Sequence, residues 1–114
     1  MITLLNFFTF AEGNGGSGFY TPWMTFPSDH QVAEYWIDCK THYAGAVDIT
    51  LESSIDGDAV QTVSGPTTVS AAGLTRSEIT DKLAPRVRLK MIEQGGGAGG
   101  VMTLSVWLVP KIGG

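Results

Sequence analysis

The sequence predicts an all-β fold: one β-sandwich or jelly roll of about seven to eight antiparallel strands. Apolar and polar residues alternate along several segments, glycine-rich turns separate these segments, and helical periodicity is almost absent. Because successive side chains of an extended chain point to opposite faces, such alternation indicates strands with one face in a core. The length of 114 residues suits a single domain over residues 1–114.

Seven segments have the composition of strands. Three of them alternate most clearly, and Pro22 lies within another, which favours an edge strand or a bulge there because proline cannot donate to a ladder. The expected core positions of the three clearest strands are Val47, Ile49 and Leu51, then Val87, Leu89 and Met91, and then Met102, Leu104, Val106 and Leu108. The other four strands are expected over residues 2–10, 19–26, 32–39 and 59–64.

Residues 75–83 fit either a short helix or an eighth strand. Thr75 and Glu78, at the start of this segment, have capping-box spacing, and Ile79 and Leu83 are four residues apart, as in a helix. The same residues also carry a weaker strand alternation. The capping pattern favours the helical turn, and Pro85 ends either element.

Glycines mark the expected turns. Asp56-Gly57 supports the positive φ angles of a tight hairpin between two strands. The glycine run 95–100 joins the two strongest strands, and we expect it to be a hairpin loop. It matches the spacing G-x-G-x-x-G, but a dinucleotide site needs a helix after the glycines, and here a strand follows.

Charge and composition exclude several classes of partner. Lys and Arg number 7 and Asp and Glu number 11, so the net charge is 7 − 11 = −4. Phosphate binding needs clustered cations, so we expect no nucleic-acid partner. No apolar run approaches the ~18 residues of a membrane span, so we expect no membrane partner. The N-terminal segment lacks the basic start of a signal peptide, so we expect no export by that route.

Residues with reactive chemistry are few. Cys39 is the only cysteine, and Cys39-x-x-His42 offers two of the four ligands of a structural zinc site. Asp56 and Asp58 offer too few oxygens for a calcium loop. No nucleophile, base and orienting group stand in a recognisable pattern. We therefore expect no metal, no cofactor and no enzymatic activity.

Aromatic residues carry more information. Strand alternation turns Trp36 and Trp107 away from the core, and residues 2–10 are apolar on both faces. Either loops of the same chain cover these faces or a partner does. Arg86 and Arg88 point outward together, towards solvent, a carboxylate or an acidic partner. The residues predicted to form an interface are Leu4, Phe8, Phe10, Trp23, Trp36, Arg86, Arg88 and Trp107.

Two sequence patterns suggest a relationship. Ser54-x-Asp56-Gly57 is followed by the segment Leu83-Ala84-Pro85-Arg86-Val87-Arg88-Leu89. This combination, over residues 45–92, resembles galactose-binding-like and discoidin-like sandwiches, although Ala59-Val60 stand where those often have a tryptophan. The chain is also similar to the short jelly-roll decoration, or cement, proteins of tailed bacteriophages in length, glycine content and low charge.

The second resemblance implies a structural virion protein. Such a protein is made in the host cytoplasm, binds the outer surface of an assembled capsid and ties subunits of the major capsid protein together. We expect a homo-oligomer, a trimer, with residues 1–18 as an N-terminal arm or strand in oligomer or capsid contacts. The alternative is a carbohydrate-binding or host-attachment module of a phage tail, with Tyr20, Trp23, Trp36 or Trp107 stacking on sugar rings.

Overall fold

The computed structural model describes residues 1–10, 19–27, 32–44, 46–80, 83–94 and 101–111; for residues 7–10, 19, 43–44, 93–94 and 101 it describes the backbone alone. These segments contain strands and no helix, and hence no helix that could cross a membrane. The strands are β1 (Ile2–Phe10), β2 (Phe19–Tyr20), β3 (Met24–Thr25), β4 (Val32–Ala44), β5 (Ala46–Ser54), β6 (Val60–Val69), β7 (Gly73–Ile79), β8 (Arg86–Gln94) and β9 (Val101–Lys111).

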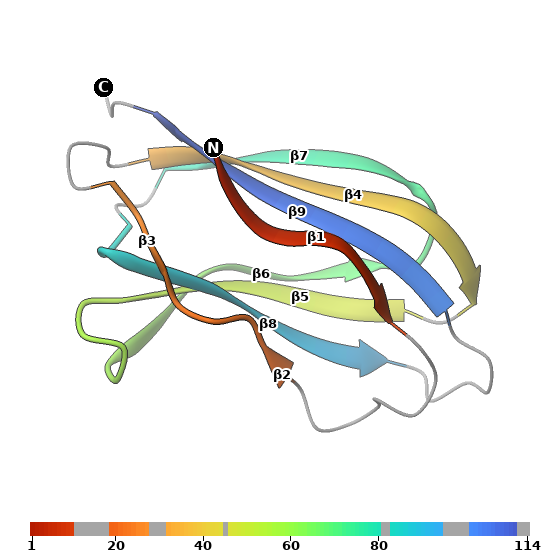
Figure 1. Cartoon of the computed structure of the whole chain (residues 1–114), viewed down its shortest axis with the longest axis horizontal. Coiled ribbons are helices and arrows are strands. Elements are labelled where there is room, and N and C mark those ends of the chain that lie inside the picture. Colours follow the sequence, from red (N-terminus) through yellow and green to blue (C-terminus); the bar gives the residue numbers. More distant parts are fainter. Residues whose placement is uncertain (11–18, 28–31, 45, 81–82, 95–100, 112–114) are drawn as a thin grey trace.

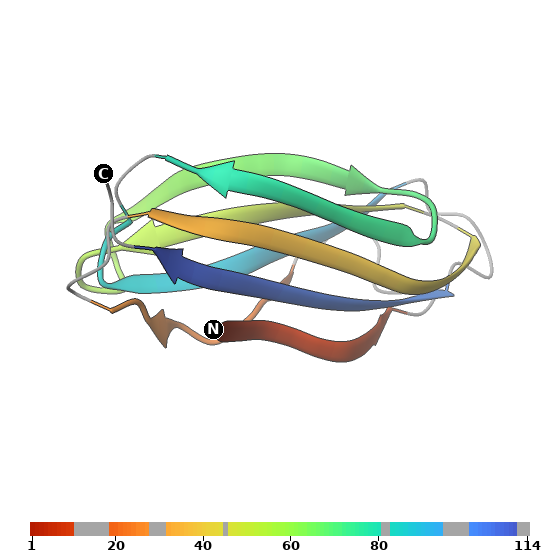
Figure 2. The same cartoon turned by 90° about the horizontal axis from the view of Figure 1, so that it is seen from above.

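The strands form two antiparallel sheets packed face to face (Figures 1 and 2). One sheet has the order β1-β9-β4-β7 and the other β2-β8-β5-β6. Strand β3 also pairs with β8, so β2 and β3 are successive pieces of one edge strand, interrupted around Pro22. With these pieces counted as one, each sheet has four strands, and the chain changes sheet at every connection except the β5–β6 hairpin, as in a jelly roll. The predicted fold class is confirmed, as is the edge position expected from Pro22.

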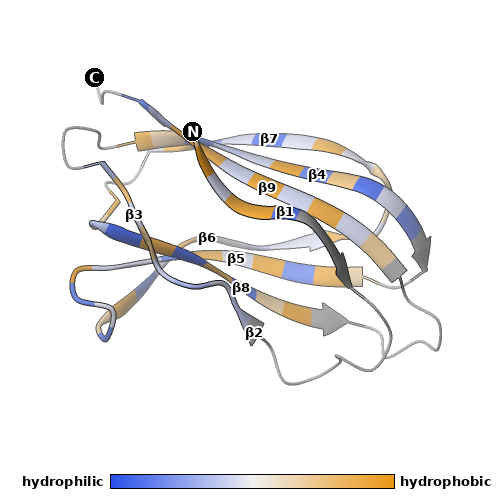
Figure 3. Cartoon of the chain, in the orientation of Figure 1, coloured by the Kyte–Doolittle hydropathy of each residue, from blue (hydrophilic) through white to orange (hydrophobic). Residues whose placement is uncertain are grey.

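The core lies between the two sheets. All ten core positions expected from the alternation are buried, and Ile49, Leu51, Val87, Leu89, Leu104, Val106 and Leu108 are 0% exposed. Figure 3 shows these apolar positions alternating with polar ones along β5, β8 and β9. Fully burying one such side chain contributes about 1.5–3 kcal/mol, so the core between the two sheets dominates the stability of the sandwich.

In strand β1, a register shift accounts for two neighbouring apolar residues that are both buried. Its register against β9 shifts twice, first between Thr3 and Leu5. At that shift Leu4 and Leu5 are both buried although they are neighbours in sequence. A bulge therefore lets both leucines enter the core.

The helical turn expected within residues 75–83 is wrong. Residues up to Ile79 belong to β7, which pairs with β4 from Ala33 to Cys39 without a register shift. A single helical turn is costly to nucleate, whereas adding a strand to an existing sheet supplies a backbone partner for the whole segment. Residues 81–82 lie outside the described residues.

The hairpin expected at the glycine run is also wrong. Strands β8 and β9 lie in different sheets, so the chain crosses the sandwich between them. Residues 95–100 themselves lie outside the described residues. The Asp56-Gly57 hairpin is confirmed, because it joins the paired strands β5 and β6. Its loop, residues 55–59, is longer than a tight two-residue turn.

Candidate interaction surfaces

Two clusters of aromatic and charged side chains lie on the opposite outer faces of the sandwich. We call the first the tryptophan face; it consists of Trp36, Trp107, Lys40 and Arg76 on the β1-β9-β4-β7 sheet. We call the second the Arg88 cluster; it consists of Tyr20, Trp23, Glu52 and Arg88 on the other sheet.

The tryptophan face is built by strand register. Trp36 on β4 lies directly opposite Trp107 on β9, and Arg76 on β7 lies opposite Trp36 on its other side. The Arg76 guanidinium carbon is 5.5 Å from the centre of the Trp36 ring, and Lys40 Nζ is 5.6 Å from the centre of the Trp107 ring. These distances are those of cation–π contacts. Each tryptophan therefore has a cation beside it and the other tryptophan as its neighbour.

Charges around the two rings are paired within the chain. Arg76 donates from Nε and Nη2 to Glu34 Oε2, the first at 3.0 Å, and Lys40 pairs with Asp38. Lys111 Nζ is 3.7 Å from the same Glu34 oxygen. The hydrogen bond from Arg76 lowers the pKa of Glu34, since it favours the charged carboxylate. The tryptophan face thus has an apolar centre with a charge-paired rim.

The Arg88 cluster is compact. The Arg88 guanidinium carbon is 4.0 Å from the centre of the Tyr20 ring and 4.2 Å from that of Trp23, and its Nε donates to Glu52 Oε1 at 2.9 Å. Glu52 is 7% exposed although it lies on an outer face. Arg88 therefore neutralises a buried carboxylate and fixes the interrupted edge strand to β8. Only Tyr20, at 48% exposure, presents a large open surface.

The loop between β5 and β6 lies beside this cluster. The hydroxyl oxygen of Ser54 accepts from the Gly57 N–H at 2.8 Å, and Asp56 Oδ1 accepts from the N–H groups of Asp58 and Ala59 at 2.8 and 2.9 Å. These backbone donors lower the pKa of Asp56. Gly57 has a φ of 88°. The Ser-x-Asp-Gly pattern is therefore a turn whose polar atoms bond within the loop.

The remaining predicted interface residues lie in different places. Leu4 is 3% exposed and belongs to the core, so its side chain offers no surface in this monomer. Phe8 and Phe10 pair with Leu104 and Met102 on β9, and their side chains lie outside the described residues. Arg86 is exposed next to the β5–β6 loop: a Cβ added at Gly57 would lie 3.2 Å from Arg86 Nη1 and 3.7 Å from Trp23 Nε1.

Sequence reasoning did not single out Glu52, Lys40 or Arg76. Each contacts a residue on a neighbouring strand that is distant in sequence; Arg76 and Glu34, for example, are 42 residues apart. For Glu52, the sequence offered one indication: alternation along its strand places this acidic residue on an outer face. Only the register shows that Arg88 stands opposite it.

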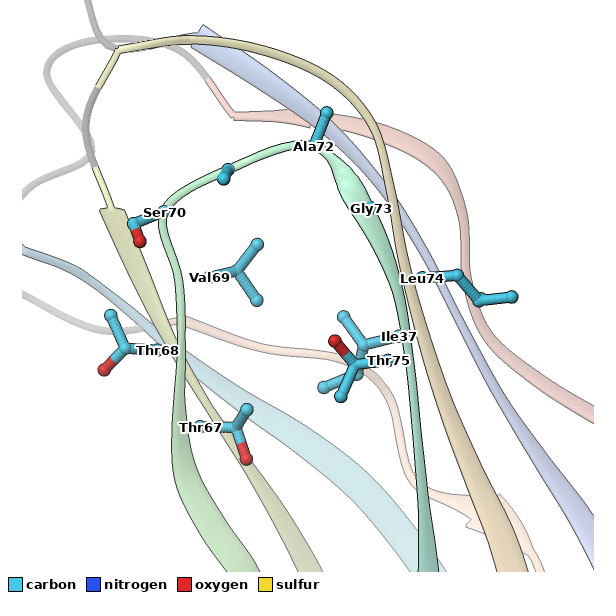
Figure 4. Close-up of a pocket in the computed structure, with 10 residues that line it drawn as sticks. Ile37, Thr67, Thr68, Val69, Ser70, Ala72, Gly73, Leu74 and Thr75 are labelled. Carbon is cyan, nitrogen blue, oxygen red and sulfur yellow. The ribbon is translucent and has the colours of Figure 1, made fainter.

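The described residues hold no group of three or more His, Cys, Asp or Glu side chains that could bind a metal ion. An open hollow of about 360 Å³ lies between β6 and β7, where Thr67, Val69, Leu74 and Thr75 are among its lining residues (Figure 4). None of the lining side chains is titratable, so the hollow supplies no acid or base for catalysis.

Comparisons with known proteins bear on the fold. No model of a protein family matches the chain, and no curated protein matches it. A chain in the structure of infectious bursal disease virus, Gx strain, matches with a TM-score of 0.58 and 16% sequence identity. The match covers 99% of this chain and 32% of that chain, so this protein spans about a third of its length. At this identity the likeness is one of fold.

Proposed function

We propose that this protein is a structural component of a virion. In this proposal it binds the outer surface of an assembled phage capsid and stabilises the shell by bridging neighbouring subunits of the major capsid protein. The jelly-roll topology and the similarity in fold to a chain of a virus structure support a virion role. The resemblance to short phage decoration proteins supports the narrower role at the capsid exterior.

The observation that carries this proposal is the pair Trp36 and Trp107 on the tryptophan face. Tryptophan is enriched at the centres of protein interfaces, where a few large side chains supply most of the binding energy. The charged side chains around the pair already have partners in the chain. A partner that covers the rings therefore need not bury an unpaired charge, which is the costly part of desolvating a charged surface.

To bridge capsid subunits, each molecule of this protein needs more than one contact surface. The Arg88 cluster, with the exposed Tyr20, offers a second surface on the opposite face of the sandwich. A homo-oligomer would multiply the contacts again, and we propose a trimer. Linked weak sites bind far more tightly than single ones because the second binding event becomes intramolecular.

Stabilisation would follow from mass action. A protein that binds the assembled shell and not the free subunits stabilises each occupied site by RT ln(1 + [L]/Kd), about 2.7 kcal/mol at 100 times Kd. The sum over many sites raises the temperature at which the shell opens, without any chemical step.

The test compares heat-induced DNA release from particles with and without this protein. We expect a higher release temperature with the protein, and only a weak effect of salt, since screening acts chiefly on exposed charges. Equal release temperatures would refute the cementing role. Loss of the effect at high salt would keep the role but move the contact from the tryptophans to charged residues such as Arg86.

The second candidate is a carbohydrate-binding or host-attachment module of a phage tail. The half-exposed Tyr20 beside Trp23 favours it, because exposed aromatic rings stack on sugars. Binding of the purified protein to a glycan array, lost in Tyr20→Ala and retained in Trp107→Ala, would support this candidate over the first.

A further inference from the structure

Strand β7 is the one regular edge among the described strands. The other three edges are interrupted: β1 shifts register twice against β9, β2 and β3 are two residues long each, and β6 shifts register twice against β5. Strand β7 runs for seven residues against β4 with no shift. Interruptions protect sheet edges from pairing with other chains, and β7 lacks them.

The side chains of β7 are exposed on both faces. Six consecutive residues, from Gly73 to Glu78, are exposed, and only Ile79 is buried. On the inner face, the exposure is explained by the hollow between β6 and β7, which Thr75 helps to line (Figure 4). Among the described strands β7 pairs only with β4, so its outer backbone edge is available for another strand.

We propose that β7 pairs antiparallel with β7 of a second copy of this chain, with Ser77 on the two-fold axis. In this register Arg76 of each copy stands opposite Glu78 of the other. Moving the axis by one residue either way would place two Arg76 or two Glu78 side chains opposite each other. Opposite charges directly across a strand pair stabilise it and like charges destabilise it, so charge selects this register.

The pairing joins two four-stranded sheets into one sheet of eight strands. It is isologous, because both copies use the same surface, and it therefore closes and does not propagate. Arg76 also keeps its place beside Glu34 and Trp36, since those contacts lie on the β4 side of β7. The contact forms without a capsid and does not rest on the proposed function; copies that also trimerise would do so through another surface.

A cysteine at the axis tests the register directly. Directly opposed residues of an antiparallel pair have Cα atoms ~4.5–5.5 Å apart, within the range of a disulfide. Ser77→Cys should therefore form a disulfide-linked dimer under mild oxidation of the purified protein. Thr75→Cys is the matched control: it is exposed on the same face of β7, but its counterpart in the other copy is four residues away along the strand. The native Cys39 is buried, which keeps the background low.

Linkage of Ser77→Cys without linkage of Thr75→Cys would support the proposal. Equal linkage of both variants, or none of either, would overturn it. Sedimentation equilibrium gives a second measurement: Glu78→Arg should weaken the association at least ~tenfold by placing like charges across both pairs. Glu78→Gln should weaken it less. A wild-type protein that stays monomeric, or an oligomer that Glu78→Arg leaves unchanged while the variant is folded, would also overturn the proposal.

Discussion

Trp36 and Trp107 lie directly opposite each other on the adjacent strands β4 and β9, with both rings on the outer face of the sheet. The residues on either side of each tryptophan, such as Tyr35 and Leu108, are buried in the core. Residues next to each other in sequence therefore differ in role: the inward-facing ones pack in the core, and the outward-facing ones form the surface. We therefore expect changes on this outer surface to leave the fold intact.

Replacing either tryptophan of the pair should weaken assembly and leave the fold intact. We expect Trp36→Ala and Trp107→Ala each to cost about 2 kcal/mol or more of capsid binding, as truncation of an interface anchor does. Thermal unfolding of the free protein should change little in comparison. Binding to purified expanded capsids and thermal melting measure the two effects separately.

Leu104→Ala is the control for this prediction. Leu104 is 0% exposed, and its truncation should cost about 2–5 kcal/mol of folding stability. If Trp107→Ala melted as early as Leu104→Ala, the tryptophan would be part of the stabilising core. If both tryptophan variants bound capsids as tightly as the wild type, the proposed contact surface would be wrong.

Arg88 and Arg86 should respond differently to truncation, although both point outward from β8. Arg88→Ala removes the partner of the buried Glu52 and the cation between Tyr20 and Trp23, so we expect a loss of about 1–3 kcal/mol of folding stability. Arg86 is exposed, and Arg86→Ala should change stability by less than about 0.5 kcal/mol. Urea unfolding of both variants checks this. Equal losses would contradict the structural role assigned to Arg88.

Gly65 should tolerate a side chain less well than Gly73. Both have positive φ angles, 117° and 148°, so alanine is strained at either position. A Cβ at Gly65 would lie 2.7 Å from the Ile49 carbonyl oxygen, whereas a Cβ at Gly73 meets nothing within 4 Å. We expect Gly65→Ala to cost about 1–3 kcal/mol more than Gly73→Ala, because backbone must move to relieve the contact. Chemical unfolding of the pair gives the difference, and equal costs would refute the close approach.

The fold should lose stability in acid. Hydrogen bonds from Arg76 and from the loop N–H groups lower the folded-state pKa values of Glu34 and Asp56 below their ordinary values of 4.5 and 3.8. The unfolded chain therefore binds these protons first as the pH falls. The stabilisation is fully present above the ordinary values and is lost as the pH falls through the lowered folded-state values.

Unfolding in urea at a series of pH values measures this effect. Glu34→Gln and Asp56→Asn keep an acceptor oxygen at each position but cannot titrate. Both variants should show a weaker decline in stability with acid than the wild type. An unchanged decline in both would show that other groups cause it.

The turn and the core show what local sequence can predict. Alternation along Val87, Leu89 and Met91 requires knowledge only of an extended chain, so their burial was predicted correctly. Asp56-Gly57 likewise forms its turn through bonds within a few residues of itself. These features depend on the preferences of neighbouring residues and not on the rest of the molecule.

Other features depend on which strands lie side by side. Strands β8 and β9 follow each other in the chain, and alternation alone does not show that they belong to different sheets. Residues 75–79 also show that local patterns do not reveal strand neighbours. Their capping pattern favours a helix, but in the folded chain they pair with β4 as a strand.

Local alternation was enough to predict the all-β class, the inner and outer faces of the main strands, and the outward direction of Trp36, Arg88 and Trp107. That Trp36 lies opposite Trp107, and that Arg88 neutralises Glu52, 36 residues away, became visible only in the folded chain. The face on which a side chain lies follows from the two-residue period of its own strand, whereas the residue opposite it on the next strand follows from strand order and register. Those are set by hydrogen bonding and packing between segments far apart in the chain.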